Sequence, residues 1–566
     1  MIPILVTWLT TNYVRTRYLR ANKRTQNIMR PSSLLSLAAS ALLLFSCTST
    51  PEDATPIKVT ILQTADIHGQ VYPHSELFYD NDEISYKTLG GLANMKTLFD
   101  QEREANPNTI ILDGGDLIQG SAVAALSEGA AFSSIIKAMN YDFLIPGNWE
   151  VVYGKEQMMK VMQGYETPVI TANMYHEDGK DPIFPQYYIQ DVGNTRLGFL
   201  SYNDPEVPIR QNPSFSVGLD FDPILENLEA LVTEMKDEKG VDILFLVTHI
   251  GISKQYDLAN NPALSRIDYV LGNDTHERIR EPLQAGHARV TEPGAFASFV
   301  GKMVLEVQNG ELLSEEYELM EVDPSKYEAD AEVAAVIEEA VAPYKEEIDE
   351  VLGYTQTPLY RYFVVENPMD NFITDASMWK NDVDIALSNG FRFSPPIVPG
   401  ENGVAPITRG DLWKMLPVNE KVKIGKASGQ QIKDWLEKEL HNVFAENPQE
   451  RFGGWVVRFS GMELKFNANA PKGERVSSIV IKGEPMELDR LYKISACRRE
   501  GEPISTLCRM KGTVETVVMD YTIHDLIEEY LAVHDTIAPV RDGRAVSLDL
   551  GDNVLSQLPG TDYHFH

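Results

Sequence analysis

Cysteine is scarce in this sequence, which has three cysteines in 566 residues. Cys47, Cys497 and Cys508 are not spaced as the ligands of a structural zinc site, so the sequence excludes a cysteine-based metal fold. Cys497 and Cys508 are near enough in sequence to form a disulfide around a short loop in an oxidising compartment, and two unpaired thiols are the equal alternative.

Basic residues are also few. Lysine and arginine together number 50 against 83 aspartates and glutamates, which gives a formal net charge of −33 at pH 7. A chain this acidic repels a phosphate backbone, so we expect no nucleic-acid partner. Hydrophobic residues make up 43% of the sequence, enough for a globular protein, and the length exceeds what one hydrophobic core usually organises. We therefore expect at least two domains.

The N-terminal apolar run is too short to span a bilayer. It covers residues 34–45, follows Met29 and ends in "LFSC", the pattern of a bacterial lipoprotein signal. The sequence therefore predicts that Met29 is the true start, that residues 1–46 are an extension and a signal, and that Cys47 carries a lipid. Residues 47–56 would tether the protein to the cell envelope, in the periplasm or at the surface, with the lipid as its sole membrane contact. An ordinary buried thiol is the alternative.

From residue 57 onward, apolar runs alternate with amphipathic stretches, which is typical of a layered α/β domain. Five of these runs end in polar residues that can bind metals. Their sequences are "IKVTILQTADIHG", "TIILDGGDLIQGS", "YDFLIPGNWE", "VDILFLVTHIG" and "IDYVLGNDTHE". Because the loops that follow successive strands gather at one edge of a sheet, we expect these ends to meet in one site.

One helix between two of these runs can be predicted in detail. Asp222 is the expected N-cap and Pro223 the first helical residue, and Gly240 ends the helix. The apolar residues between them share one face, so this helix should cover one flank of a sheet. That face comprises Ile224, Leu225, Leu228, Leu231, Val232 and Met235.

The polar ends of the five runs contribute seven candidate metal ligands. They are Asp66, His68, Asp116, Asn148, His249, Asp274 and His276. Carboxylate and imidazole groups together suit one or two divalent cations such as Mn²⁺, Zn²⁺ or Fe²⁺. Each residue alone is weak support, because an isolated histidine is more often a surface or core group, but the pattern recurs at five strand ends. A carboxylate shared by two cations about 3.5 to 4 Å apart would create a bridging hydroxide.

The motifs "DIHG", "GGDLIQGS", "GNWE", "THIG" and "NDTHE" resemble the motif blocks of calcineurin-like metallophosphoesterases. The segments "NFITDA", "DIALSNGFR", "TRGDLWKMLP" and "FSGMEL" resemble the C-terminal domain of the 5′-nucleotidase family. The resemblance implies an α/β protein with a four-layer α-β-β-α metal domain over residues 57–325. A linker helix over 326–353 would join it to an α+β substrate-binding domain over 354–550, followed by a tail over 551–566.

The resemblance also implies how the ligands divide between two divalent metal ions. One ion would be bound by Asp66, His68, Asp116 and His276. The other would be bound by Asp116, Asn148, His249 and Asp274, with Asp116 bridging. The family has histidine at the position of Asp274, and the added carboxylate makes the site more anionic, which favours Mn²⁺ with Zn²⁺ as the alternative. A weakly held second ion would also be consistent with the change.

The sequence departs from the family at the residue after the asparagine ligand. Nucleotidases of this family have a histidine there, paired with an aspartate three residues later, whereas this sequence has Trp149 and Val152. Without that acid pair, an ester with an alkoxide leaving group should be cleaved about 10²- to 10⁴-fold more slowly. Asp116, Asn148 and Trp149 are the candidate catalytic residues.

The segments "GNWEVVYG", "NPMDNFITDA" and "ALSNGFR" are similar to the thiosulfohydrolases of bacterial sulfur oxidation. Those enzymes release sulfate from a sulfane chain bound to a carrier protein, and a sulfur anion leaves without an acid. The resemblance therefore implies a hydrolase for a phosphate- or sulfate-type group with a good leaving group. A Trp149 that only packs in the core is the alternative.

Three arginines indicate an anionic substrate. Arg392 matches an anion-binding arginine of the family, and Arg498 and Arg499 occupy a segment in which nucleotidases place a base-stacking aromatic residue. The alternative for the 498/499 pair is surface charge. We therefore expect a small anionic substrate or a sulfur-carrier protein as the partner.

Two other functions are compatible with the sequence. One is a 5′-nucleotidase or broad phosphoesterase of nucleotide catabolism, because the family resemblance covers both domains. The other is a non-catalytic metal-binding envelope protein, because Trp149, Val152 and Asp274 all depart from the nucleotidase pattern.

Overall fold

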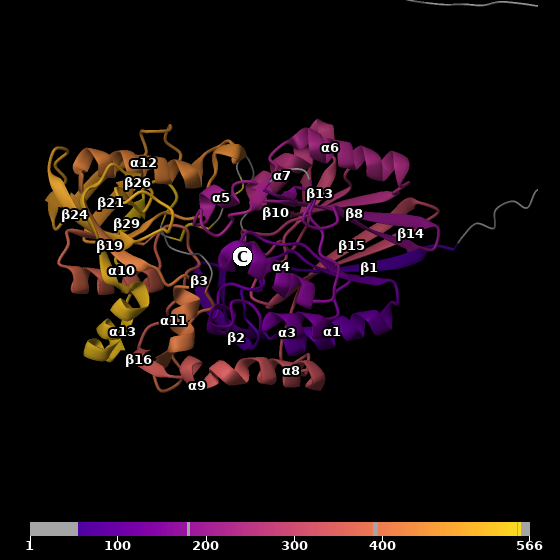
Figure 1. Ribbon diagram of the computed structural model, residues 1–566, viewed down its shortest axis with the longest axis horizontal. Coiled ribbons are helices and arrows are strands. Elements are labelled where there is room, and N and C mark those ends of the chain that lie inside the picture. Colours follow the sequence, from indigo (N-terminus) through magenta and orange to yellow (C-terminus); the bar gives the residue numbers. More distant parts are fainter. Residues whose placement is uncertain (1–54, 178–180, 389–393, 552, 556–557, 559–566) are drawn as a thin grey trace, which may run out of the picture. The chain divides into compact units, whose positions relative to one another are not determined.

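The computed structural model describes residues 55–177, 181–388, 394–551, 553–555 and 558 (Figure 1). A five-stranded sheet contains the first three of the five predicted strands. Its order is β15 (Glu311–Glu321), β14 (Phe299–Gln308), β1 (Ile57–Thr64), β4 (Thr109–Asp113) and β5 (Phe143–Leu144). Strands β1, β4 and β5 are parallel, so their carboxyl ends lie at the same edge.

A second, six-stranded sheet contains the other two predicted strands. Its order is β12 (Leu283–Ala285), β13 (Ala288–Thr291), β11 (Tyr269–Leu271), β10 (Ile243–His249), β8 (Thr195–Asn203) and β7 (Tyr187–Val192). Strands β8, β10, β11 and β13 are parallel, and β7 and β12 are antiparallel edge strands. The sequence predicted one sheet edge for all five loops, whereas the structure divides the loops between two sheets.

An apolar layer lies between the two sheets, where both faces are buried. It joins residues of β1 and β4 to residues of β8 and β10, such as Val59 and Leu112 with Phe199 and Phe245. The rings of Phe199 and Phe245 are stacked with centroids 4.7 Å apart. Continuous apolar strands of this kind are expected where both faces of a sheet are covered.

Helices cover the outer face of each sheet (Figure 1). The first sheet packs against α1 (Leu92–Ala105), α3 (Phe132–Met139), α4 (Lys155–Gly164) and α8 (Ala331–Val341). The second sheet packs against α6 (Leu225–Thr233) and α7 (Ile252–Asn260). The predicted four-layer α-β-β-α arrangement is confirmed.

Helix α6 begins later than the sequence predicts. The Oδ1 of Asp222 accepts a hydrogen bond from the backbone N–H of Ile224 at 2.8 Å, which forms a turn before the helix. Ile224 is extended and is the N-cap, so the predicted cap at Asp222 is wrong. Leu228, Val232 and Met235 are buried against the sheet as expected, but Ile224 is exposed.

The connecting helix is interrupted. Helix α8 ends at Val341, a 3₁₀ turn covers Ala342–Tyr344, and α9 covers Lys345–Ile348. Pro343 lies in this turn and has no N–H for a helical hydrogen bond, which accounts for the break. Strand β16 (Val351–Thr355) begins inside the segment predicted as linker and pairs with strands of the C-terminal half.

The C-terminal half is α+β, as expected. One sheet has the order β20 (Arg458–Ser460), β17 (Ile385–Ser388), β24 (Leu491–Cys497), β19 (Lys421–Ser428) and β27 (Val514–Thr522). A smaller sheet has the order β18 (Ala405–Thr408), β16 and β28 (Thr536–Ile537), and another has β23 (Glu484–Pro485), β22 (Val476–Ile481), β21 (Met462–Phe466) and β29 (Ala545–Ser547). The main helices are α10 (Pro368–Asn381), α11 (Arg409–Met415), α12 (Gly429–Phe444) and α13 (Ile523–His534).

Cys497 and Cys508 are free thiols, so of the two alternatives the structure has the unpaired one.

Candidate metal centre

All seven predicted ligands lie at or just beyond the carboxyl ends of parallel strands. Asp66 and His68 follow β1, Asp116 follows β4 and Asn148 follows β5. From the second sheet, His249 ends β10, and Asp274 and His276 follow β11. Asp66, His68, Asp116, Asn148 and His249 are buried, and Asp274 and His276 are partly buried.

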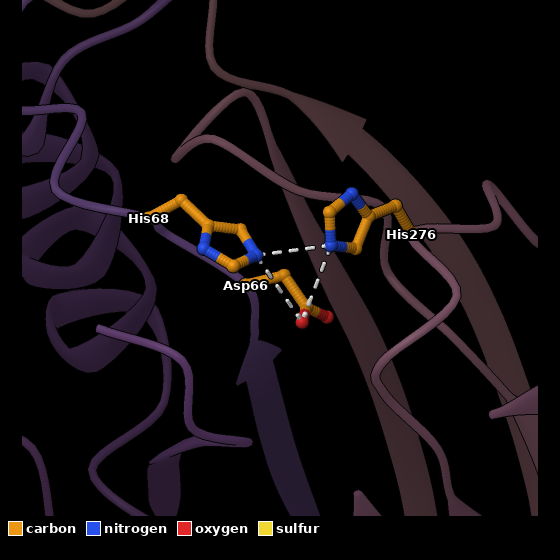
Figure 2. A group of neighbouring side chains, drawn as sticks. All are labelled: Asp66, His68 and His276. Carbon is orange, nitrogen blue, oxygen red and sulfur yellow. Dashed lines mark hydrogen bonds and ion pairs between the residues drawn. The ribbon is translucent and has the colours of Figure 1, made fainter. Parts of the chain in front are cut away.

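Two compact groups of ligand atoms form where these loops meet. Asp66, His68 and His276 point toward one another from both sheets (Figure 2). The His276 Nε2 lies 3.1 Å from the His68 Nε2 and 3.5 Å from the Asp66 Oδ1. The second group comprises Asp66, Asp116 and His249, in which the His249 Nε2 lies 3.2 Å from the Asp116 Oδ2 and 3.8 Å from the Asp66 Oδ1.

Asp116 lies between the histidines of the two groups. Its Oδ2 is 3.7 Å from the His68 Nε2 and 3.2 Å from the His249 Nε2. A carboxylate that bridges two cations must lie between the two groups of ligands, as Asp116 does. Asp66 also reaches both groups, because its Oδ1 is 4.0 Å from the His68 Nε2 and 3.8 Å from the His249 Nε2. The centre therefore offers two candidate bridging carboxylates, whereas the family resemblance implied one.

Backbone carbonyls orient two of the histidines. The Nδ1 of His68 lies 2.8 Å from the carbonyl oxygen of Gln119, and the Nδ1 of His249 lies 2.7 Å from that of Gly114. Since a carbonyl oxygen only accepts, each Nδ1 carries the proton and each Nε2 keeps its lone pair for a metal.

The site fits divalent cations because two inward-facing atoms lack another partner. Among the described residues, the Asp66 Oδ1 and the His249 Nε2 are buried and have no hydrogen-bond partner. Burial raises the pKa of Asp66 to about 7. Burial lowers the pKa of His249, but the neighbouring carboxylates, Asp116 first, outweigh it and raise that pKa well above its usual value. Buried charge of this kind needs compensation, which a metal ion supplies in place of protons.

Asn148 and Asp274 are engaged with each other and with side chains that the sequence did not single out. The Nδ2 of Asn148 donates to the Oδ1 of Asp274, and the Oδ1 of Asn148 accepts from the Nε2 of Gln211 at 2.7 Å. Arg210 forms an ion pair with the Oδ2 of Asp274 at 3.3 Å. The guanidinium stabilises the extra carboxylate but is shared with the buried Asp204, so the site stays anionic and the preference for Mn²⁺ stays a prediction.

Backbone strain is concentrated at the ligands. Five of the seven have positive φ angles, which L-residues other than glycine seldom adopt. They are Asp66 (51°), His68 (48°), Asp116 (60°), Asp274 (91°) and His276 (61°). The surrounding structure must over-determine these conformations, which is typical of functional sites.

Glu150 is a supporting residue that the sequence analysis missed. Its buried carboxylate accepts hydrogen bonds from the backbone N–H groups of Asp116 at 3.0 Å, Leu117 at 2.6 Å and Gly147 at 2.6 Å. It thereby ties the Asp116 loop to the loop that carries Asn148. The loops are so close that a Cβ on Gly147 would lie 2.2 Å from the Asp116 Oδ1. The sequence did offer one signal for this role, the glutamate of "GNWE". It follows the predicted ligand Asn148 by two residues, and a charged residue near a buried site needs a partner.

Family models match both halves of the chain. A calcineurin-like phosphoesterase model matches residues 59–278, and a 5′-nucleotidase C-terminal domain model matches residues 350–496. The chain belongs to the calcineurin-like phosphoesterases that carry a 5′-nucleotidase C-terminal domain. As a member of this family, the phosphoesterase is a metal-dependent hydrolase.

Individual relatives of this phosphoesterase are distant in sequence. The 5′-nucleotidase of Vibrio cholerae is 24% identical over 573 residues, covering 90% of this chain and 98% of that protein. The trifunctional nucleotide phosphoesterase protein YfkN of Bacillus subtilis is 24% identical over 68% of this chain, which spans 30% of that protein. The structure of the Thermus thermophilus sulfate thiohydrolase SoxB is 21% identical, with a TM-score of 0.79 over 89% of this chain and 98% of that one. At this identity, the structural likeness establishes the fold.

A cavity beside the metal ligands of this phosphoesterase holds the residues predicted to contact substrate. Asp116, Asn148 and Trp149 line it together with Arg498 and Arg499. Trp149 is 7% exposed and packs against Ala295 and Phe296. The indole therefore packs in the core and also borders the cavity, so a packing role and a role at the catalytic site are compatible. Arg392 and Cys47 lie outside the described residues.

Aromatic residues of the cavity come from a segment that the sequence analysis did not consider. Phe452 and Trp455 line the cavity, from the chain that follows α12. The cavity also contains further cations, Arg210, Lys254, Arg451 and Arg509. The protein thus has a partly aromatic cavity in which six lysine and arginine side chains lie beside four carboxylates, in a chain whose net charge is strongly negative.

No helix among the described residues is long and apolar enough to cross a membrane.

We predict that Glu150→Ala weakens metal binding by about 10- to 100-fold, because three backbone N–H groups around Asp116 and Gly147 lose their acceptor and the ligand loops lose their register. Calorimetric titration with Mn²⁺ measures the effect. The matched control is Glu156→Ala, which removes an exposed glutamate in the first turn of α4. Wild-type affinity in Glu150→Ala would contradict the supporting role.

Proposed function

We propose that the phosphoesterase cleaves a sulfate- or phosphate-type group from a leaving group that is stable as an anion, with thiosulfohydrolase-like chemistry as the leading form. The observation that carries this proposal is the identity of residues 149 and 152. Trp149 borders the cavity next to Asp116 and Asn148, where nucleotidases of this family place a proton-donating histidine.

Trp149 and Val152 occupy facing positions. Trp149 is the N-cap of a 3₁₀ turn over Glu150–Tyr153 and Val152 lies within it; residues three apart lie on the same side of such a turn, and the two side chains belong to one apolar cluster. Neither side chain can donate a proton to an oxygen leaving group. A sulfur anion needs no such proton, so the apolar pair is compatible with cleavage of a sulfur–sulfur bond.

The metal site supplies the nucleophile. When bound, two divalent cations lower the pKa of water and neutralise charge on the transferred group. Asp66 and Asp116, which reach both histidine groups, would hold the cations together, with His68 and His276 on one side and Asn148, His249 and Asp274 on the other. The backbone N–H of Trp149 donates to the Asp116 Oδ1 at 2.8 Å and fixes the carboxylate that lies between the two groups.

The charge of the cavity supports an anionic substrate. Its six lysine and arginine side chains lie beside four carboxylates, two of which are the predicted ligands Asp116 and Asp274, so cations in the metal site would leave the lining positive and able to attract and orient a sulfonate or phosphate. The Arg498 side chain lines the cavity and forms no hydrogen bond or ion pair with the described residues, so its guanidinium donors are available to a ligand. We propose Arg498 as a substrate contact, with Arg392 as a second one from the sequence.

The reaction balances without a redox partner. In a thiosulfonated cysteine, Cys–S–S–SO₃⁻, a water oxygen bonds to the sulfonate sulfur while the bond between that sulfur and the neighbouring sulfane sulfur breaks. The electron pair leaves on the sulfane sulfur as a persulfide anion, the released protons enter solvent or the persulfide, and the products are sulfate and a cysteine persulfide. A cysteine on a carrier protein or a small anionic thiosulfonate would each provide this bond.

A nucleotide phosphoesterase is the second candidate, and Phe452 and Trp455 favour it. Both aromatic residues line the cavity, and an aromatic ring there can stack on a nucleobase. The two candidates differ in the leaving group, because AMP requires departure of a ribose alkoxide.

We predict that the metal-loaded protein releases sulfate from a thiosulfonated cysteine peptide and releases phosphate from AMP only slowly. Asp116→Ala should lower sulfate release by about 10³-fold or more, because it removes a carboxylate that reaches both metal groups. Ion chromatography measures sulfate, and circular dichroism checks the fold of the variant. Rapid hydrolysis of AMP with no sulfate release would establish the second candidate instead, and no turnover of either substrate would favour a non-catalytic binding protein.

We predict that Trp149→His combined with Val152→Asp raises AMP hydrolysis by at least about tenfold, since a histidine then borders the cavity and an aspartate lies beside it on the same side of the turn. Trp149→Phe is the matched control, because it removes the indole without adding a proton donor. If the double variant gains nothing over Trp149→Phe, the leaving-group argument fails.

We further propose that Cys47 anchors the protein to the cell envelope through a lipid. The support is the short apolar run before Cys47 and the polar tether after it. In a bacterial host, Cys47→Ser should move the protein from the membrane fraction to the soluble fraction and abolish palmitate labelling. Cys497→Ser is the control and should leave both unchanged; equal labelling of Cys47→Ser would disprove the anchor.

A further inference from the structure

Two neighbouring side chains contact the ligands of the second cation position. Arg210, the last residue of helix α5 (Val207–Arg210), has its Nη1 and Nη2 3.3 Å from the Oδ2 of Asp274. The next residue, Gln211, donates to the Oδ1 of Asn148 at 2.7 Å. The position of α5 therefore decides how Asn148 and Asp274 are presented. Arg210 is fixed in turn by an ion pair to the buried Asp204.

The end of α5 is held by an arginine of the C-terminal domain. The Nη2 of Arg499 lies 3.1 Å from the carbonyl oxygens of Ile209 and Arg210 and 2.7 Å from that of Gln211. Carbonyls at the end of a helix have no partner within the helix, and a guanidinium satisfies them well. The Nη1 of Arg499 pairs with Glu502 at 2.9 Å, and the side chain is 15% exposed.

Arg499 is thus committed to protein contacts on both of its terminal nitrogens, although it borders the cavity. This differs from the sequence expectation, in which Arg498 and Arg499 bind substrate together. A second contact with the C-terminal domain, from the Asn212 side chain to Glu420, lies one residue beyond Gln211. The C-terminal domain therefore contacts residues 209–212 through two side chains, Arg499 and Glu420.

We propose that Arg499 is a positioning residue through which the C-terminal domain maintains the second cation position. It holds α5, whose Arg210 and Gln211 side chains fix Asp274 and Asn148. Residues that orient metal ligands typically change metal affinity by about 10- to 100-fold when removed. The inference rests on the two-cation site of the proposed function. It assigns Arg499 a role in metal affinity and leaves substrate contact to Arg498.

Ligands of the first cation group should be insensitive to this contact. Asp66 and His68 follow β1 and His276 follows β11, and His68 is oriented by the Gln119 carbonyl, so none of the three depends on the Arg210 and Gln211 side chains for its place in the chain. Loss of Arg499 should therefore affect one of two cations. A general loss of folding would weaken both.

The test compares Arg499→Ala with Arg498→Ala in the full chain. Metal-free protein is titrated with Mn²⁺ by calorimetry, and bound metal is counted by elemental analysis after dialysis. In Arg499→Ala we expect about tenfold weaker binding of the second Mn²⁺ with the first unchanged, and a lower kcat with little change in KM at limiting Mn²⁺. In Arg498→Ala we expect two Mn²⁺ ions bound with wild-type affinity and a higher KM.

The outcomes separate this inference from the proposed function. If the wild-type protein binds two Mn²⁺ ions and Arg499→Ala binds both as tightly, the positioning role of Arg499 is wrong and the metal site stands. If the wild-type protein does not bind two, the proposed two-cation site itself fails. Arg499→Lys, which keeps the charge but cannot span three carbonyls, serves if circular dichroism shows that Arg499→Ala is unfolded. The inference is overturned if Arg499→Lys binds the second Mn²⁺ with wild-type affinity. It is also overturned if the variant binds both ions equally weakly.

Discussion

Two buried carboxylates, Asp66 and Asp116, lie within 4.0 Å of histidine ring nitrogens that face the same space, and the rest of the centre is arranged around them. Such a group is costly to bury unless its charges are matched. Asp66 shows the cost directly, because burial raises its pKa to about 7. For Asp116, burial acts in the same direction, but the charge of His249 outweighs it and holds the pKa of Asp116 well below its usual value. Cations between the two carboxylates would stabilise both as anions, which is why the loops accept strained backbones to bring them together.

The two-sheet architecture explains how ligands from distant segments converge. Parallel strands β1, β4 and β5 deliver three loops from one sheet, and parallel strands β10 and β11 deliver two from the other. The apolar layer between the sheets sets their separation and so the distance across the metal site. A cavity-forming substitution in that layer would therefore act on the chemistry without touching a ligand.

The sequence predicted that these seven side chains would meet because each one lies at or soon after the end of a strand, so local pattern was enough to place it; their role as metal ligands stays a prediction. It predicted the layers for the same reason, since strand and helix periodicity is local. The start of α6 was wrong because Asp222 bonds to the N–H of Ile224 in a turn, an alternative to capping that the same residue type offers. Arg210, Gln211 and Arg499 were beyond reach, because their roles arise from contacts between segments far apart in the chain.

Asp274 illustrates how a carboxylate is accommodated at a position where the family resemblance implies histidine. Replacing a neutral histidine by aspartate adds one negative charge beside Asp116, which would repel it in a water-poor site. Burial raises the pKa of Asp274, but the charge of Arg210 at 3.3 Å, with that of His249, outweighs it and holds this pKa below its usual value. Arg210 is shared with the buried Asp204, so it stabilises Asp274 without removing the added negative charge from the site. The ion pair also connects Asp274 to α5, whose last carbonyl oxygens accept hydrogen bonds from Arg499 of the C-terminal domain. A carboxylate at this position therefore makes the second cation position dependent on a contact between the two domains, if Arg499 has the positioning role that we propose.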